Sequence, residues 1–538
     1  MNKKPNILIF NPDEMRWDTM GHMGNPAAST PRLDAFAEGE AVSFRHAYCQ
    51  NPVCVPSRCS FFTGLYPHTT GHRTMGYLMR EHETSLLKEL KEAGYYVWAN
   101  ARNDLVAGEY PGLIESHVTE MYYGGNAEPA PGFESDNPRG DRNCPSFYSF
   151  CNGKLKNDAQ GKNYTADDED VDAAIERILH PVSDKPLCLF VGLLYPHPPY
   201  NVEEPYYSAI DRTKLPHRVT AKETSGKTAM HTRLQKFQNV AGMSEEQWDE
   251  LRAIYLGMCA KVDEQFGRIC DALKAAGEYD NTAIFFLSDH GDYAGDYDIV
   301  EKAQNCFEDC LTRVPLLIKP PKGMAVDPGV TDSFAELVDF YATVLDVAGV
   351  KSCHSHFGRS LMPVVENRKA EVRKQVFCEG GRLDSELHCS ESVDPKIHNG
   401  FCFTTMWPRY AAQFDGEAHA KGVMIRTGEW KYIYRAHGQS ELYHLTEDPH
   451  ELCNVAGLPE HRELITELRF HILEWYQDTC DVVPFDKNLR FNQQIIWEKV
   501  KSMCPAGCEK QVKEKINSTM NLFVVKEYCA RLAEEKEK

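Results

Sequence analysis

The sequence contains no run of eighteen apolar residues, the length that a helix needs to cross a membrane. Met1–Pro5 leads directly into a short apolar segment, without the longer apolar stretch and small-residue cleavage site of a secretory signal. These observations indicate a chain without a membrane span or an export signal. We therefore expect a soluble, cytoplasmic protein.

An excess of basic residues is also missing. The chain has 59 Lys and Arg against 79 Asp and Glu, a net charge of −20. Binding to nucleic acid neutralises phosphates with a basic face, and no basic cluster stands out here. The charge disfavours a highly sulfated polymer as a substrate more weakly, because a local pocket can oppose the global charge.

Paired cysteine spacings typical of zinc sites are absent, although the chain has nineteen cysteines. In a chain without an export signal, we expect these residues to be reduced thiols that pack mostly as small buried hydrophobes. The segment Cys504–Cys508 has a spacing that could serve a metal or redox site, but we favour the structural interpretation for it as well.

The chain is long, and predicted strands alternate with predicted helices along it. Its 538 residues, 42% of them hydrophobic, can bury one large core and a smaller second one. Buried-strand patterns alternate with amphipathic helices, which predicts an α/β fold with a large, mostly parallel sheet and helices on both faces. The strands are expected at 6–10, 42–44, 95–99, 186–194, 282–287 and 314–318, and the helices at 30–37, 85–94, 167–179, 244–276 and 334–348.

Three parts are expected along the chain. Residues 1–370 carry the alternating pattern, interrupted at about 107–165 by a segment rich in Gly, Pro, Asn and Tyr that we interpret as an insertion at the mouth of a pocket. Residues 371–485 favour a smaller α+β domain with an antiparallel sheet, including a hairpin that turns at Thr427-Gly428 and a helix at about 460–477. Residues 486–538 are charged and partly helical, and could wrap the body or mediate self-association.

Acidic residues follow two of the predicted strands directly. Asp13 and Glu14 come after the first strand, and Asp289 and His290 come after the strand at 282–287. Ligands collect at the carboxyl ends of parallel strands. Asp13 and Glu14 could cap a helix or bind a hard cation, but three carboxylates meeting at one edge cannot all stay ionised without a cation.

Two further segments carry candidate chemistry. In Cys54-Val-Pro-Ser-Arg58 a thiol stands beside a rigid turn and a guanidinium, and the structural alternative is a buried Cys at a helix start with Pro in its first turn. His197 lies between prolines after the strand at 186–194 and is either structural or catalytic. Lys302 follows in a polar loop beyond His290.

With these residues in view, the chain resembles the formylglycine-dependent sulfatases of the alkaline-phosphatase superfamily. The carrying segments are the Asp13 strand end, Thr30–Asp34, Cys54–Gly64, the His197 loop, Ser288–Gly291, Lys302, and Arg426 through Glu451. The resemblance implies that Cys54 is oxidised to formylglycine, whose hydrate is the nucleophile. It also implies a divalent cation, calcium before magnesium or manganese, bound by Asp13, Asp289, His290 and residue 54, with Glu14 as a further ligand.

The same resemblance implies the remaining roles and partners. Arg58 would steady the aldehyde hydrate, while His197 and Lys302 would contact the sulfuryl oxygens and help the leaving group depart. The expected partners are a small-molecule sulfate ester and a maturation enzyme that generates the formylglycine, with self-association through the C-terminal tail as a further expectation.

The chain departs from the usual sulfatase pattern at two places. Leu65 stands where an Arg is common, and Ala101-Arg102-Asn103-Asp104 replaces a Gly-Lys-x-His segment. Arg102 keeps the positive charge beside the substrate, whereas Asp104 puts an acid in place of an imidazole. Phosphonate monoester hydrolases and phosphodiesterases of the same family are therefore the alternative activity, and a catalytically silent metal-binding scaffold with an unmodified Cys54 is the alternative outside enzymes.

Overall fold

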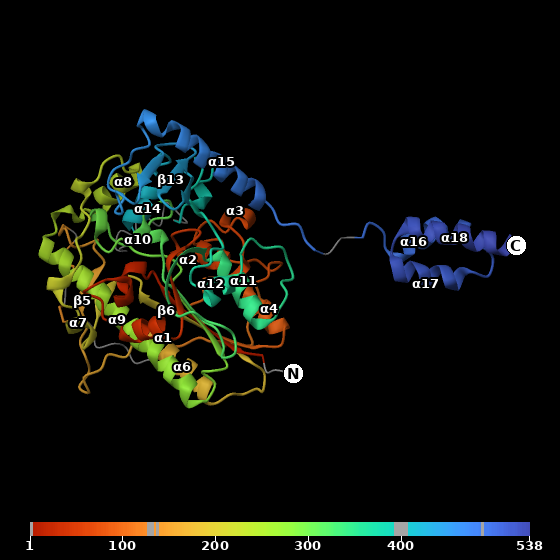
Figure 1. Cartoon of the computed structure of the whole chain (residues 1–538), viewed down its shortest axis with the longest axis horizontal. Helices are drawn as coiled ribbons and strands as arrows, with labels where there is room; N and C mark the ends of the chain where they lie inside the picture. The colour runs from red at the N-terminus through yellow and green to blue at the C-terminus, as the bar shows by residue number, and fades with distance from the viewer. Residues whose placement is uncertain are drawn as a thin grey trace. The chain divides into compact units, whose positions relative to one another are not determined.

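The computed structural model describes residues 4–125, 134–135, 139–141, 143–391, 407–485 and 489–537. The chain forms two compact units, Met1–Val482 and Val483–Lys538, and each is described by itself (Figure 1). Among the described residues, no helix is both long and apolar enough to span a membrane.

An eight-stranded sheet forms the centre of the first unit. Neighbouring strands in this sheet run parallel, except that one strand runs antiparallel to both of its neighbours. In spatial order the strands are β10 (Gly329–Glu336), β2 (Val42–Tyr48), β9 (Leu316–Lys319, the antiparallel one), β8 (Thr282–Leu287), β1 (Asn6–Asp13), β6 (Leu187–Pro196), β3 (Tyr96–Asn100) and β4 (Glu120–Tyr122). The mostly parallel sheet expected from the sequence is confirmed.

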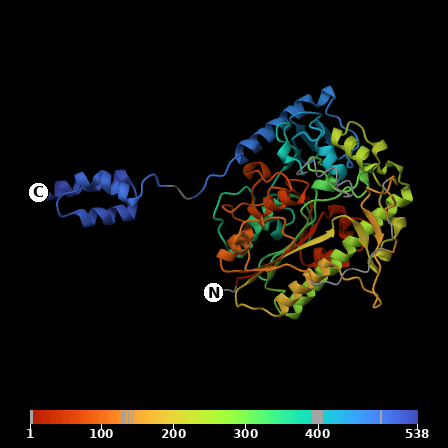
Figure 2. The same cartoon turned by 180° about the vertical axis from the view of Figure 1, so that it is seen from behind.

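Strand β1 shows why both faces of this sheet are covered. Ile7 and Ile9 enter one apolar core, and Leu8 and Phe10 enter the other, because successive side chains point to opposite faces. The first core includes residues of α2 (Cys54–Thr63), α4 (Leu86–Glu92) and α11 (Val338–Ala348). The second includes residues of α1 (Pro31–Gly39), α6 (Ala166–Leu179) and α9 (Glu245–Ala275), and the two sets of helices flank the sheet in Figures 1 and 2.

Local sequence patterns predicted the positions of most of these helices correctly. The Ser244 side chain accepts the Gln247 amide hydrogen and completes the capping box that starts α9. The helix expected at 334–348 is wrong at its start, because Phe334 belongs to β10 and α11 begins at Val338. Strand and helix follow each other there without a Gly or Pro, so their apolar patterns merge in the sequence.

A second, antiparallel sheet follows later in the chain, as expected. It consists of β11 (Val376–Gly380), β12 (Gly422–Arg426), β13 (Trp430–Arg435) and β14 (Glu441–His444). The β12–β13 hairpin turns at Thr427-Gly428, where the Thr427 amide donates to the Trp430 carbonyl. Helix α15 (Arg462–Thr479) packs on this sheet through Leu468, Ile472 and Trp475.

The remaining helices are short. They are α3 (Pro67–Thr70), α5 (Leu113–His117), α7 (Tyr206–Ala209), α8 (Ala229–Gln238), α10 (Asp309–Thr312), α12 (Met362–Glu366) and α14 (Trp407–Gln413). Within the described part of 107–165, the regular elements include α5, β4 and β5 (Cys151–Lys154). Strand β5 pairs with β7 (Tyr200–Val202). Residues 126–133, 136–138 and 142 of this expected insertion lie outside the described residues.

The second unit contains α16 (Gln493–Val500), α17 (Glu509–Thr519) and α18 (Leu522–Glu537). Their inward-facing side chains form a separate apolar core made of Ile496, Val500, Val512, Ile516, Val525 and Cys529. Cys508 is buried, and Cys504 packs partly buried against this core.

Candidate active site

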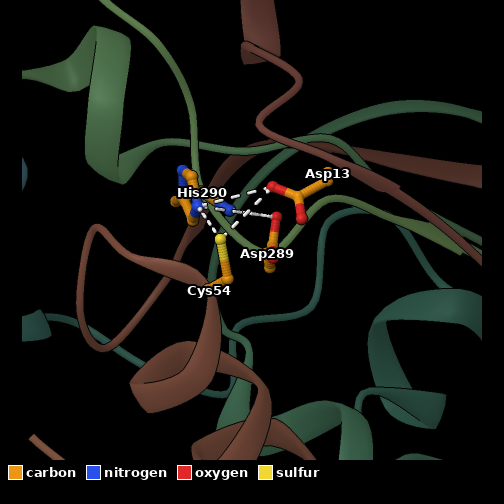
Figure 3. A group of neighbouring side chains, drawn as sticks. All are labelled: Asp13, Cys54, Asp289 and His290. Atoms are coloured by element: carbon orange, nitrogen blue, oxygen red, sulfur yellow. Dashed lines mark hydrogen bonds and ion pairs between the residues drawn. The ribbon is translucent and has the colours of Figure 1, made fainter. Parts of the chain in front are cut away.

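The carboxyl ends of two adjacent parallel strands bring the predicted ligand residues together. Asp13 ends β1, and Asp289 lies two residues beyond β8. His290 follows Asp289, and Cys54 is the first residue of α2, with its Sγ 3.1 Å from His290 Nε2 and 3.4 Å from Asp13 Oδ1 (Figure 3). All four side chains are buried.

Arg58 lies one helical turn after Cys54 and therefore on the same face of α2. Its Nε donates to Asp289 Oδ2 at 2.8 Å, and its Nη2 donates to Asp13 Oδ2 at 2.9 Å. Burial alone would raise the pKa of Asp13, but the Arg102 and Arg58 guanidinium groups hold it well below its ordinary value. The Asp13 carboxylate is therefore charged at neutral pH.

Arg102 reaches the same carboxylate from the loop after β3. Its Nη2 is 2.5 Å from Asp13 Oδ2. Gly192 of β6 permits this loop position, since a Cβ added there would lie 2.4 Å from the Arg102 carbonyl oxygen. Asp104 Oδ2 lies 3.9 Å from Arg102 Nη2, and the two side chains are 29% and 28% exposed. They form the open edge of the site.

Glu14 and Lys302 form the other side of the site. Lys302 Nζ donates to Glu14 Oε2 at 2.6 Å and is 3.1 Å from Glu301 Oε1. Burial raises the pKa of Glu14 well above its ordinary value even though Lys302 opposes the shift. Burial would lower the pKa of Lys302, but Glu14 and Glu301 raise it well above its usual range, so the ammonium stays charged.

His197 approaches Glu14 from the loop after β6, with Nε2 3.5 Å from Glu14 Oε2. Its Nδ1 is 2.6 Å from the Pro198 carbonyl oxygen and therefore carries a proton. Burial, with the nearby Lys302 charge, lowers the pKa of His197 well below its ordinary value. The neutral ring thus presents an unprotonated Nε2 to the site.

The donor set fits a divalent cation. Asp13, Cys54, Asp289 and His290 each offer a ligand atom within 4.8 Å of the others, and Asp13, Glu14 and His197 form a second such group. His290 Nδ1 lies 2.9 Å from the Gly291 carbonyl oxygen, which fixes the tautomer and leaves Nε2 for an ion. Glu14 Oε1 is buried without a hydrogen-bond partner, as a further ligand oxygen would be.

The structure thus brings together all ten residues singled out from the sequence. Sequence reasoning missed two others: Glu301 contacts Lys302, and Arg409 of α14 forms a buried ion pair with Glu301. Glu301 could have been noticed as an acid adjacent to Lys302. Arg409 follows in the chain more than a hundred residues later, without a motif, and nothing in the sequence signals it.

Known proteins share this chain's sequence pattern and fold. The Sulfatase family profile matches residues 5–350. The chain is 26% identical over 492 residues to "Arylsulfatase K" of Danio rerio, covering 84% of this chain and 80% of that protein. It is also 26% identical over 509 residues to "Choline-sulfatase" of Rhizobium meliloti (strain 1021), covering 92% and 90%.

Among solved structures, the phosphonate monoester hydrolase of Agrobacterium radiobacter superposes with a TM-score of 0.68 at 22% identity. The alignment covers 88% of this chain and 96% of that one, so the two proteins share the alkaline-phosphatase-like fold. The family profile spans well over half of the present chain and includes all ten site residues singled out from the sequence. The chain therefore belongs to the sulfatase family and is a hydrolase.

Proposed function

We propose that the chain hydrolyses small-molecule sulfate monoesters, with Cys54 matured to formylglycine and a divalent cation bound by Asp13, Asp289, His290 and residue 54. Glu14 would be a further ligand. The observation that carries this proposal is the position of Cys54, whose Sγ lies against Asp13 and His290 one turn from Arg58.

An unmodified Cys54 is poorly suited to catalysis. Burial, together with the Asp13 carboxylate, raises the pKa of the Cys54 thiol well above its ordinary value. A protonated thiol is a weak nucleophile. The hydrated aldehyde of formylglycine would supply one hydroxyl to attack sulfur and a second to release sulfate, and the cation would supply Lewis-acid activation.

The chain's own residues would bind and orient the sulfuryl group. Lys302 has three N–H donors and two carboxylate contacts, which leaves a donor for a sulfuryl oxygen. A bound anion would raise the pKa of His197, so that Nε2 could take a proton and pass it to the leaving oxygen. Arg102, at the open edge, is placed to balance the negative charge of the ester.

The cation is proposed to be calcium, since carboxylate oxygens dominate the ligand set, with magnesium and manganese as alternatives that tolerate one imidazole. A formylglycine-generating enzyme is the partner that this proposal requires. Exhaustive chelation is expected to abolish hydrolysis and to lower the melting temperature together, because Asp13, Glu14 and Asp289 then repel one another. Unchanged activity and stability after chelation would contradict the cation assignment.

Phosphonate monoester hydrolysis is the second candidate activity. Sulfate and phosphonate monoesters each carry one negative charge at neutral pH, whereas a phosphate monoester carries nearly two. Asp104 lies at the open edge of the site, where it would penalise the second charge. This acid favours both singly charged esters over phosphate and does not separate them from each other.

The experiment compares kcat/KM for p-nitrophenyl sulfate, a p-nitrophenyl phenylphosphonate monoester and p-nitrophenyl phosphate. We expect the sulfate to be hydrolysed fastest, and Cys54→Ala to abolish hydrolysis while keeping the melting temperature near that of the wild type. Cys453→Ala, which changes an exposed cysteine, is the matched control. A faster phosphonate reaction would support the second candidate, and no reaction with any ester would support the silent scaffold.

A further inference from the structure

A second group of metal-ligand side chains lies outside the active site. Glu89 comes from α4, and Cys353 and His354 come from the loop between α11 and α12. Cys353 Sγ is 3.1 Å and His354 Nδ1 is 3.2 Å from the same oxygen, Glu89 Oε1, and the sulfur and nitrogen are 3.8 Å apart. The three atoms thus surround one point.

This group is separate from the catalytic residues. His354 contacts the carbonyl of Thr63, the last residue of α2, whereas Cys54 is the first residue of that ten-residue helix. At about 1.5 Å per residue the two ends are roughly 14 Å apart. The cluster is therefore at the opposite end of the helix that carries the proposed nucleophile.

The hydrogen bonds of His354 prepare its ring as a ligand. Nε2 lies 2.9 Å from the Thr63 carbonyl oxygen and must donate to it, which leaves the Nδ1 lone pair facing Glu89 and Cys353 in the neutral ring. A ring whose second nitrogen donates to a backbone carbonyl is the usual arrangement for a metal-bound histidine. The tautomer is thus set by a group outside the cluster.

The donors around this point all serve one oxygen of Glu89. Tyr341 donates its hydroxyl to Glu89 Oε1 at 2.7 Å, the Cys353 amide donates to the same oxygen at 3.4 Å, and the Cys353 thiol offers a weak donor at 3.1 Å. Glu89 is only 3% exposed at its side chain, and its Oε2 is buried without a hydrogen-bond partner. A buried carboxylate oxygen left in this way costs free energy unless a cation is nearby.

We propose that Glu89, Cys353 and His354 form a second metal site, distinct from the catalytic one, that binds Zn²⁺. Thiolate, imidazole and carboxylate together are a zinc donor set, whereas calcium and magnesium select oxygen ligands. Cys353 is exposed, so an ion can enter from solvent, and water can fill the fourth position. Binding breaks the Cys353 S–H bond and releases that proton to water.

Such an ion would connect three segments. It would join α4, the loop that starts after α11 and, through His354, the carbonyl end of α2. Binding to the folded state alone raises stability, by about 2.7 kcal/mol at a free-ion concentration one hundred times the dissociation constant. We therefore expect zinc to stabilise the chain without being consumed or required in hydrolysis.

Cobalt(II) is the probe, because its thiolate complexes absorb in the near ultraviolet. The experiment uses the full chain in a Cys54→Ala background, which removes the thiol of the catalytic cluster. After chelation and buffer exchange, Co²⁺ is added and then displaced by Zn²⁺. We expect one of the bound Co²⁺ ions per chain to give a thiolate charge-transfer band that zinc abolishes, and a rise in melting temperature with zinc.

Three further variants locate the site. Cys353→Ser is expected to remove the band and His354→Ala to weaken zinc affinity at least tenfold, whereas Cys453→Ser, at another exposed cysteine, changes neither. Glu89→Gln is expected to weaken affinity as well, but it alters a buried group, so the exposed Cys353 variant decides if Glu89→Gln fails to fold. Absence of the band in the parent, or an equal band in Cys353→Ser, would overturn the proposal.

Discussion

At the scale of a single residue, the guanidinium of Arg58 contacts three parts of the active site. Two of its nitrogens bind the buried carboxylates of Asp289 and Asp13, and the third donates to the carbonyls of Arg102 and Asn103. Its planar fork matches this arrangement, which a lysine ammonium cannot reproduce. Arg58 thus fixes the ligand acids and the loop at the open edge at once.

Arg58→Gln is expected to destabilise the fold by about 3–5 kcal/mol, because it leaves buried acids without their cation. The measurement is urea-induced unfolding of the chelated protein. The control is Arg45→Gln, which breaks an ion pair of Arg45 with Asp332 on the surface and should cost about 1 kcal/mol or less. Equal losses in the two variants would show that the buried pairs do not hold the site.

Asp104 is the residue at which charge selectivity is tested. Two unit charges at about 4 Å interact by roughly 4 kcal/mol at an effective dielectric near 20, and partial exposure of Asp104 reduces that value. Asp104→Asn and Asp104→His are therefore expected to narrow the ratio of kcat/KM for p-nitrophenyl sulfate over p-nitrophenyl phosphate by about tenfold or more. An unchanged ratio would mean that Asp104 does not act on the substrate's charge.

At the scale of elements, the antiparallel sheet supports the segment that presents Lys302. Lys431 of β13 donates to the Phe307 carbonyl at 2.9 Å, and Arg435 donates to the Asn305 carbonyl at 2.9 Å. His419, just before β12, lies 2.7 Å from the Gln304 side chain. The smaller sheet therefore contributes to the active site indirectly, by fixing the loop after β8.

His419 makes the stability of the fold depend on pH. Burial, with the nearby Arg382 and Arg435 charges, lowers the pKa of His419 from 6.5 to about 3. The unfolded chain binds a proton at His419 more readily than the folded chain does. The contribution of neutral His419 to the free energy of unfolding is therefore complete above pH 6.5 and is lost as the pH falls toward 3. His419→Gln should flatten the stability profile in that window by about 1.4 kcal/mol per pH unit.

The measurement is the free energy of unfolding in urea from pH 7 to pH 4. His437→Gln replaces an exposed histidine and serves as the control, with no expected change in slope. If His419→Gln and wild type lose stability in parallel as the pH falls, the buried neutral form of His419 is not part of the fold's stability.

At the scale of the whole molecule, local patterns predicted the main sheet well. Strands buried on both faces are continuous apolar runs, and the acids that follow them, such as Asp13 and Asp289, lie at the edge where parallel strands end. Contacts between segments that are far apart in the chain leave no such pattern in the sequence. Arg409 with Glu301, and Glu89 with Cys353, become neighbours only when the chain is folded.

The C-terminal unit is expected to be dispensable for catalysis and needed for self-association. All proposed catalytic groups lie within residues 1–482, whereas Ile495, Met503 and Phe523 of the second unit are exposed apolar side chains. A chain ending at Val482 should keep kcat/KM within about twofold and elute as a monomer, while the full chain forms oligomers. Light scattering that gives a monomer for both chains would contradict the association proposal.

The chemical state of Cys54 tests the central claim most directly. Trypsin releases the peptide His46–Arg58, which contains Cys49 as an internal reference thiol. After co-expression with a formylglycine-generating enzyme and alkylation, the mass should show one alkylated cysteine, Cys49, and an aldehyde at position 54 that reacts with a hydrazide. A peptide with both cysteines alkylated, from a preparation that hydrolyses p-nitrophenyl sulfate, would contradict the proposed nucleophile.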